Sequence, residues 1–298
     1  MSSFLPEGWR PLRKEDAAAV AEVVAEDERL LGHPGAVSAQ DVLAWWRRTD
    51  LQANSWAHAE AARLVALGWL ELFGGDVIAV GVVRPGAKAR GLGVTIVETA
   101  ELRAHELGAS TLRQIAFGPD DAARTLLESR GYREVRRHYE MARRLDGEVP
   151  EPLLNADLAI DTFRDEEARA FQAAANESFA EEWGFHDLPF DEWWAMRKDD
   201  DKTLWFVIRD GDEIAAVARC EAGRGGGYVG MLGVRSPWRR RGLGRALLMH
   251  AFREFRRSGF DRASLGVDSE NPTGATRLYE SVGMHVESEY VTFEKELA

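Results

Sequence analysis

One stretch of the chain decides how its second half folds: Val234-Arg235-Ser236-Pro237-Trp238-Arg239-Arg240-Arg241-Gly242-Leu243-Gly244-Arg245-Ala246-Leu247-Leu248. The segment that leads into it, Tyr228–Val234, is mostly apolar and bounded by glycines, which predicts a strand. After the turn, apolar residues recur at the spacing of one helix face as far as Phe255, and Gly259 provides a stop signal. The sequence therefore predicts a strand that enters a helix through a turn rich in glycine and arginine.

This turn has the properties of an anion-binding site. The first N–H groups of a helix are unpaired and carry a partial positive charge. Gly242 and Gly244 have no Cβ, so a phosphate can approach the backbone closely. The surrounding cations are Arg239, Arg240, Arg241 and Arg245. The glycine spacing alone does not distinguish an anion-binding site from an ordinary glycine turn or a basic run on the surface. The pattern is neither a dinucleotide fingerprint nor a P-loop.

Two ordered motifs resemble the GNAT superfamily of N-acetyltransferases. The first, Arg239–Gly244, is similar to the family's R/Q-x-x-G-x-G/A element, which binds the pyrophosphate of acetyl-CoA. The second, Asn271–Met284, resembles the closing element, in which an Asn precedes a Leu-Tyr helix and a Gly-aromatic pair. Here Met284 replaces the aromatic residue, and the spacing from Asn271 to Tyr279 is one residue longer than the commonest form. The resemblance implies an acetyl-CoA-dependent enzyme.

Composition narrows the class of protein. The 298 residues are enough for two domains, and 45% of them are hydrophobic. No apolar run approaches a membrane span and the N-terminus has no signal-peptide core, so we expect a soluble cytoplasmic protein, monomeric or homodimeric. A single cysteine, Cys220, excludes an internal disulfide, and the seven histidines are scattered, so no metal site is expected. The net charge of −12 argues against a nucleic-acid partner.

The first half of the sequence repeats features of the second. A constant offset relates three pairs: Val83 and Val234, Gly91 and Gly242, Gly93 and Gly244. A linker rich in proline, glycine and acidic residues covers 146–152, so we predict domains at 1–147 and 153–298. Hairpins and strand–helix crossovers in each half predict an α+β fold with a mixed, largely antiparallel sheet flanked by helices. The resemblance makes these two tandem GNAT-like domains.

Local signals place several further elements. Ser38 is expected to be the N-cap of a helix, with Asp41 three residues later completing the capping interaction. Strands are predicted at Leu64–Leu72 and Val77–Val83, joined at Gly74-Gly75-Asp76, and again at Leu204–Ile208 and Ile214–Arg219. Closing strands are predicted at Leu265–Asp268 and Tyr290–Lys295.

Only the second half matches the family's functional residues. The first half has Leu127 at the position of Tyr279, no asparagine to match Asn271, and only Lys88 and Arg90 at its turn. We therefore expect that it does not catalyse acetyl transfer. It either shapes the acceptor pocket as a structural partner or still binds CoA.

The resemblance also implies roles in the second half. Tyr279 is the general acid for the departing CoA thiolate. The acetyl-CoA contacts are implied for Leu232, Gly233, Val234, Arg239, Arg240, Arg241, Gly242, Leu243, Gly244, Arg245 and Asn271. The strand before the turn has no Glu, so the candidates for general base are Glu221, Asp268 or an ordered water. The acceptor is expected against Phe179, Glu182, Trp183 and Trp194, where aromatic rings beside carboxylates suit a cationic amine.

These observations predict an acetyl-CoA-dependent N-acetyltransferase that acylates the amine of a small molecule by direct attack on the thioester. A variant of the same class resembles mycothiol synthase and acetylates a cysteinyl pseudodisaccharide. A non-catalytic acyl-CoA-binding sensor and a purely structural protein are the alternatives from other classes. The sensor would bind CoA and be indifferent to Tyr279→Phe, whereas the structural protein would not depend on Gly242 or Gly244.

Overall fold

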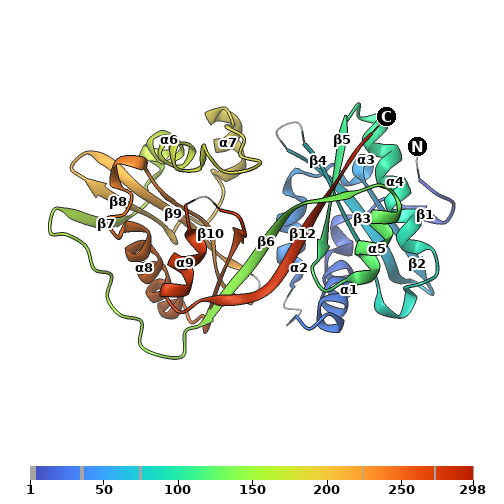
Figure 1. Cartoon of the computed structure of the whole chain (residues 1–298), viewed down its shortest axis with the longest axis horizontal. Coiled ribbons are helices and arrows are strands. Elements are labelled where there is room, and N and C mark those ends of the chain that lie inside the picture. The colour runs from blue at the N-terminus through green and yellow to red at the C-terminus, as the bar shows by residue number, and fades with distance from the viewer. Residues whose placement is uncertain (1–4, 34–36, 74–75, 224, 272, 298) are drawn as a thin grey trace. The chain divides into compact units, whose positions relative to one another are not determined.

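Apart from the short α3, helices and strands follow the same order in the two halves of the chain (Figure 1). The computed structural model describes residues 5–33, 37–73, 76–223, 225–271 and 273–297. The first half contains β1 (Trp9–Arg10), α1 (Ala17–Leu30), α2 (Ala39–Trp45), α3 (Leu51–Asn54), β2 (Ser55–Glu60), β3 (Arg63–Phe73), β4 (Asp76–Val83), α4 (Leu92–Glu106), β5 (Thr111–Phe117), α5 (Asp121–Ser129) and β6 (Arg133–Arg144). The second half contains β7 (Leu158–Thr162), α6 (Ala168–Phe179), α7 (Phe190–Arg197), β8 (Trp205–Asp210), β9 (Glu213–Gly223), β10 (Gly226–Val234), α8 (Leu243–Arg257), β11 (Arg262–Asp268), α9 (Ala275–Ser281) and β12 (His285–Glu296). Among the described residues, no helix combines the length and the apolarity that crossing a membrane requires.

The local predictions agree with these elements. Ser38 caps α2, since its hydroxyl accepts a hydrogen bond from the Asp41 N–H at 3.2 Å and its own N–H donates to the Asp41 carboxylate at 2.8 Å. The predicted hairpins and closing strands correspond to β3–β4, β8–β9, β11 and β12, although β8 begins at Trp205 rather than Leu204 and β12 extends over 12 residues, from His285 to Glu296. Three parts of the sequence predictions lie outside the described residues: the first four residues of the N-terminal segment, Gly74-Gly75 of the first hairpin turn, and Pro272 of the closing motif.

The chain forms two compact units, made of residues 1–139 with 288–298 and of residues 140–287. Within the first unit the strand order is β1-β2-β3-β4-β5-β12, within the second it is β11-β10-β9-β8-β7, and β6 has residues in both units. In each unit one pair is parallel, β4 with β5 and β10 with β11, while the hairpin pairs are antiparallel. The mixed, largely antiparallel sheet flanked by helices is therefore confirmed. The duplication boundaries at 147 and 153 stay a prediction.

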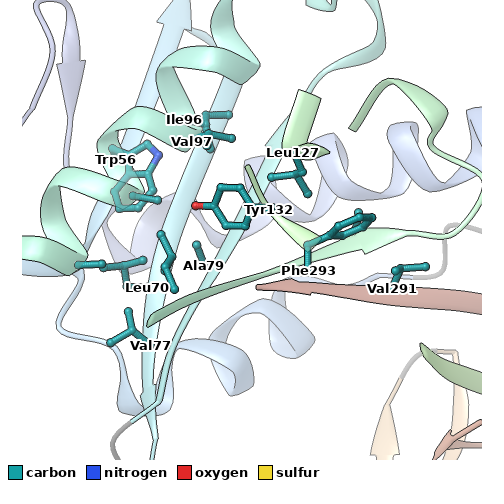
Figure 2. Packing of buried hydrophobic residues seen from close by; sticks show 14 of the residues in the cluster. Trp56, Leu70, Val77, Ala79, Ile96, Val97, Leu127, Tyr132, Val291 and Phe293 are labelled. Carbon is teal, nitrogen blue, oxygen red and sulfur yellow. The ribbon is translucent and has the colours of Figure 1, made fainter. Parts of the chain in front are cut away.

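The first unit takes the last strand of its sheet from the end of the chain. In β12, Tyr290 to Glu296 pair antiparallel with Phe117 to Thr111 of β5. The strand also contributes Val291 and Phe293 to the core, where they lie with Leu127 and Tyr132 (Figure 2). The buried apolar side chains of β12 thus belong to the core of the first unit.

Helices cover both faces of the sheet in the second unit (Figure 1). A Cβ added at Gly227 of β10 would meet the ring of Phe255 on α8, whereas one added at Gly233 would meet Ser178 and Phe179 of α6. These contacts place α8 on one face and α6 on the other. The α6 face is filled by aromatic residues, including Phe163, Phe171 and Trp205.

The contact between Gly227 and Phe255 predicts the outcome of one substitution. A Cβ at position 227 would lie 2.2 Å from Cγ of the fully buried Phe255 ring. We expect Gly227→Ala to lower the free energy of unfolding by about 1–3 kcal/mol through overpacking. Urea denaturation measures this loss. Gly147→Ala is the control, because nothing lies within 4 Å of its added Cβ. Equal midpoints for the two variants would contradict the expected clash.

Candidate active site

The centre of the site is a β-bulge in β10. Val229 is paired with Cys220 and Met231 with Arg219, so Gly230 is an extra residue in the strand. The parallel pairing of β10 with β11 covers only Gly227 to Val229. Beyond this point β10 continues to Val234 without pairing to β11, and the two strand ends separate. A glycine inside a strand pattern is a known signal for a bulge, but the sequence analysis did not use it.

The turn after β10 holds the start of α8 open to solvent. Gly242 is the N-cap, with φ at 82° and no side-chain cap, and nothing would lie within 4 Å of a Cβ placed there. Arg240 also has a positive φ, of 61°. Gly244 serves a different purpose, because a Cβ at this position would lie 3.1 Å from Leu278 on α9. One glycine therefore shapes the turn, and the other permits α8 and α9 to pack closely.

The four arginines of the turn have different surroundings. The guanidinium of Arg239 donates to the carbonyls of Val234 and Ser178, both at 3.2 Å, and that of Arg245 donates to the Ser281 carbonyl at 2.9 Å. Arg241 lies 3.7 Å from the Asp210 carboxylate. Arg240 is exposed and forms no hydrogen bond or ion pair with any residue that the structure describes. Arg240 is thus the cation with the least structural role.

Tyr279 lies on α9 with only 8% of its surface exposed. Burial raises the pKa of its phenol, and the nearby Glu182 and Tyr228 raise it further. The phenol therefore holds its proton at neutral pH. Within the described ranges, no hydrogen bond engages the hydroxyl.

Glu182 follows α6 and lies close to Tyr279. Its Oε1 accepts a hydrogen bond from Nδ2 of Asn271 at 2.9 Å. Burial raises the pKa of the Glu182 carboxyl, and the charge of Asp268 adds to this effect, while Asn271 and Arg239 oppose it. The oxygen of the Asn271 side chain accepts from the N–H of Thr273 at 2.9 Å, which fixes the orientation of the amide. The sequence analysis had assigned Asn271 to the cofactor and Glu182 to the acceptor.

The two carboxylates predicted as bases differ in position. Asp268 ends β11, is half-buried, acts electrostatically on Glu182, and accepts a hydrogen bond from the Glu270 N–H at 2.9 Å. The Glu221 side chain is 45% exposed, and its carboxylate lies 3.8 Å from the Arg219 guanidinium. Asp268 therefore joins the cluster around Glu182, whereas Glu221 faces an arginine.

The predicted acceptor residues separate into two groups. Phe179, at the end of α6, lies against Gly233 of β10, and Trp183 is 39% exposed in the segment beside Glu182. Trp194 instead stacks on Phe190 with ring centroids 6.1 Å apart and packs on the aromatic core below α6. Trp194 is thus in large part a core residue.

The corresponding turn of the first half has the same backbone and different surroundings. Ala89 and Gly91 have φ of 60° and 85°, close to the values at Arg240 and Gly242. Lys88 pairs with Asp27 at 2.7 Å and Asp120 at 3.0 Å, and Arg90 pairs with Glu60 at 2.6 Å. The β3–β4 register runs from Ala66–Val83 to Phe73–Asp76 without a bulge. The turn is retained, but the bulge is not, and Ala89 stands at the position of the exposed Arg240.

Comparison with known proteins agrees with this geometry. Residues 161–284 match the model of the acetyltransferase (GNAT) family. A mycothiol acetyltransferase of Thermobispora bispora is 32% identical over 217 residues, which cover 68% of this chain and 70% of that protein. The chain belongs to the GNAT family of acetyltransferases. This GNAT protein is an acyltransferase that uses acetyl-CoA to acetylate the amine of a small molecule.

Solved structures show the same architecture. A GCN5-related N-acetyltransferase from Sphaerobacter thermophilus superimposes with a TM-score of 0.85 at 30% identity, covering 98% of this chain and 97% of that one. A tandem GNAT protein from the clavulanic acid biosynthesis pathway has a TM-score of 0.74 at 16% identity, covers 97% of this chain and 98% of that one, and supports the fold alone. The predicted tandem GNAT architecture of this chain is confirmed.

The raised pKa of Glu182 predicts a pH-dependent effect on stability. Because burial favours the protonated form, the contribution of this carboxyl to stability is full below its ordinary pKa of 4.5 and is lost as pH rises through its pKa in the folded protein. Gln has no proton to lose. We therefore expect Glu182→Gln to gain stability relative to the parent chain as pH rises from about 4 to about 8.

Urea denaturation at the two pH values measures this gain. The exposed neighbour provides the control variant, Glu181→Gln, whose side chain is 74% exposed. A difference between Glu182→Gln and the parent that does not change with pH would contradict the expectation.

Proposed function

We propose that the second unit binds acetyl-CoA where β10 leaves β11 and transfers the acetyl group to a small amine approached from the α6 side. The observation that carries this proposal is the bulge at Gly230 in the same unit as a protonated phenol, Tyr279, and a half-buried carboxyl, Glu182, that acts on it electrostatically. Tyr279 and Glu182 have complementary chemistry, because the phenol gives a proton and the carboxylate takes one.

Acetyl-CoA binding uses mainly backbone groups in this proposal. The N–H and C=O groups of Leu232, Gly233 and Val234 line the separated edge of β10 and hydrogen-bond the pantetheine arm. The first N–H groups of α8, at Gly242 to Gly244, receive the pyrophosphate together with Arg240 and Arg241. Arg239 and Arg245 contribute positive charge while they tie the turn to α6 and α9.

The chemical step follows from the two side chains. Glu182 takes a proton from the amine, and the nitrogen attacks the thioester carbonyl. A C–N bond forms and the C–S bond breaks, and Tyr279 gives its proton to the departing sulfur. The tyrosinate then recovers a proton from Glu182 through solvent, so the net change moves one proton from nitrogen to sulfur. None of these steps requires a metal.

Glu182 is a better candidate for the base than either predicted carboxylate. Its raised pKa lies closer to the working pH, and Asn271 fixes its orientation. Glu221 is engaged with Arg219, and Asp268 supports the proton affinity of Glu182 through its negative charge. Asn271 is therefore a positioning residue in this proposal.

The acceptor has a second candidate. The names of the relatives favour a mycothiol-related amine, such as a cysteinyl sugar.

The first half is proposed as a structural partner without its own acetyl transfer, because Leu127 replaces Tyr279 and its turn cations are paired with carboxylates.

The role of Tyr279 predicts a specific loss of rate. We expect Tyr279→Phe to reduce kcat about a hundredfold, because the thiolate loses its proton donor. Free-thiol release from acetyl-CoA across a panel of amines measures the rate, and calorimetry measures acetyl-CoA binding. Unchanged kcat in a variant that binds acetyl-CoA normally would favour the sensor over the enzyme.

The role of Glu182 predicts a change in the pH profile. In the parent chain kcat/KM falls as pH decreases through the raised pKa of Glu182, since the base becomes protonated. Glu182→Gln should lower kcat/KM about a hundredfold or more and remove that limb. Asn271→Ala should shift the limb to higher pH, because the amide that lowers the pKa of Glu182 is lost. Glu181→Gln is the control and should keep the parent profile.

The difference between the two halves predicts one CoA site for each chain. Isothermal titration with acetyl-CoA should give a single binding event that Gly242→Val abolishes, because the left-handed backbone at Gly242 disfavours a branched side chain. The equivalent Gly91→Val variant should keep CoA binding. A second binding event that only Gly91→Val removes would show that the first half also binds CoA.

A further inference from the structure

Two partly buried arginines of the second unit act on each other electrostatically. Arg219 projects from β9, and Arg197 is the last residue of α7. Only 17% of the Arg219 side chain and 20% of the Arg197 side chain are exposed. Burial, and then the positive charge of Arg197, lower the pKa of the Arg219 guanidinium. The two cations therefore repel each other in a poorly solvated place.

The hydrogen bonds of these arginines are few and long. Each guanidinium has five N–H donors. Arg219 donates to the Gly230 carbonyl at 3.4 Å and lies 3.8 Å from the Glu221 carboxylate. Arg197 donates to the Asp200 carboxylate at 3.3 Å, and its Nε is buried without a hydrogen-bond partner. Most of the donors of this pair are thus unused by the described residues, although buried guanidinium groups normally pair closely.

A carboxylate is the ligand that best matches this pair. Its two oxygens accept the parallel N–H groups of a guanidinium, and its charge separates the two cations. Asp200 and Glu221 already supply one negative charge for each arginine, at a distance. The site therefore accepts the single negative charge of a ligand carboxylate more readily than the two negative charges of a phosphate.

The pair lies beside the proposed reacting centre. Arg219 contacts the carbonyl of Gly230, the residue that forms the bulge. Tyr228 acts electrostatically on both Arg219 and Tyr279. The subsite requires an acceptor whose amine meets Glu182 while a nearby substituent meets the arginines.

We propose that Arg219 and Arg197 form a subsite for a carboxylate of the acceptor, so that the substrate is an amino acid or a similar compound with an amine and a carboxylate close together. This inference rests on the proposed acetyl transfer. It separates the two candidate acceptors, because a cysteinyl sugar has its cysteine carboxyl in an amide and offers no carboxylate.

Pairs of amino acids and their amides test the subsite. The two members of a pair carry the same side chain and differ in the carboxylate, and kcat/KM is compared after correction for the fraction of neutral amine. We expect the parent chain to prefer the acid by roughly tenfold to a hundredfold, the range for hydrogen bonds to a charged group. A cysteinyl sugar is assayed alongside the pairs.

Variants connect the preference to the two arginines. Arg197→Gln should reduce the ratio of acid to amide to about one, and Arg219→Lys should reduce it by about tenfold, because lysine keeps the charge and loses the planar fork. Arg256→Gln, which changes an exposed arginine of α8, is the control and should keep the parent ratio. Circular dichroism and the thermal midpoint verify that each variant is folded. If Arg219→Lys does not fold, the ratio for Arg197→Gln decides.

Each outcome bears on the subsite. An acid preference that disappears in Arg197→Gln supports it. Equal turnover of acids and amides by the parent chain, a preference that survives Arg197→Gln, or turnover of the cysteinyl sugar alone would overturn it and leave the proposed acetyl transfer intact. A chain that binds acetyl-CoA and acetylates no amine would remove both.

Discussion

The site depends on the point at which β10 stops pairing with β11. Up to Val229 the strand pairs with both neighbours, and from Gly230 to Val234 it pairs with β9 and not with β11. Three glycines make this change possible for different reasons: Gly227 admits the Phe255 ring, Gly230 forms the bulge under Arg219, and Gly233 admits the end of α6. A bulge bends and twists a strand locally, which turns the second half of β10 away from its neighbour. A regular strand would fill the space that the substrates require.

Around this opening the protein keeps ionisable groups in places that are costly for folding. Tyr279 is deeply buried, Glu182 is partly buried and acted on by the charge of Asp268, and the partly buried Arg219 is acted on by the charge of Arg197. Each arrangement opposes folding stability. Together they leave a phenol that keeps its proton, a carboxyl of raised proton affinity and two arginines with unused donors. Such groups are typical of functional sites.

The sequence predicted the parts of the site that local patterns determine. The helix period of α8, the glycines of its first turn and the Leu-Tyr pair in α9 all lie within short stretches, so their arrangement could be read in order. The hydrogen bond between Glu182 and Asn271 could not be predicted, because it joins positions 89 residues apart. The arginine pair was missed for the same reason. Arg239 and Arg245 were assigned to the phosphate from sequence proximity, yet their long side chains also reach backbone carbonyls of α6 and the end of α9.

The strand that completes the first unit is made last. Residues 290–296 pair with β5, and Val291 and Phe293 are buried in a core whose other buried members precede Arg133 in the chain. A ribosome adds about 5–20 residues each second, so the edge of β5 waits roughly 10–30 seconds for its partner. During this interval the nascent first unit presents an unpaired strand beside exposed apolar surface, which is the kind of edge that recruits other chains. The tandem arrangement thus makes folding of the earlier half conditional on synthesis of β12, and a chain that ends before β12 is left with an open sheet.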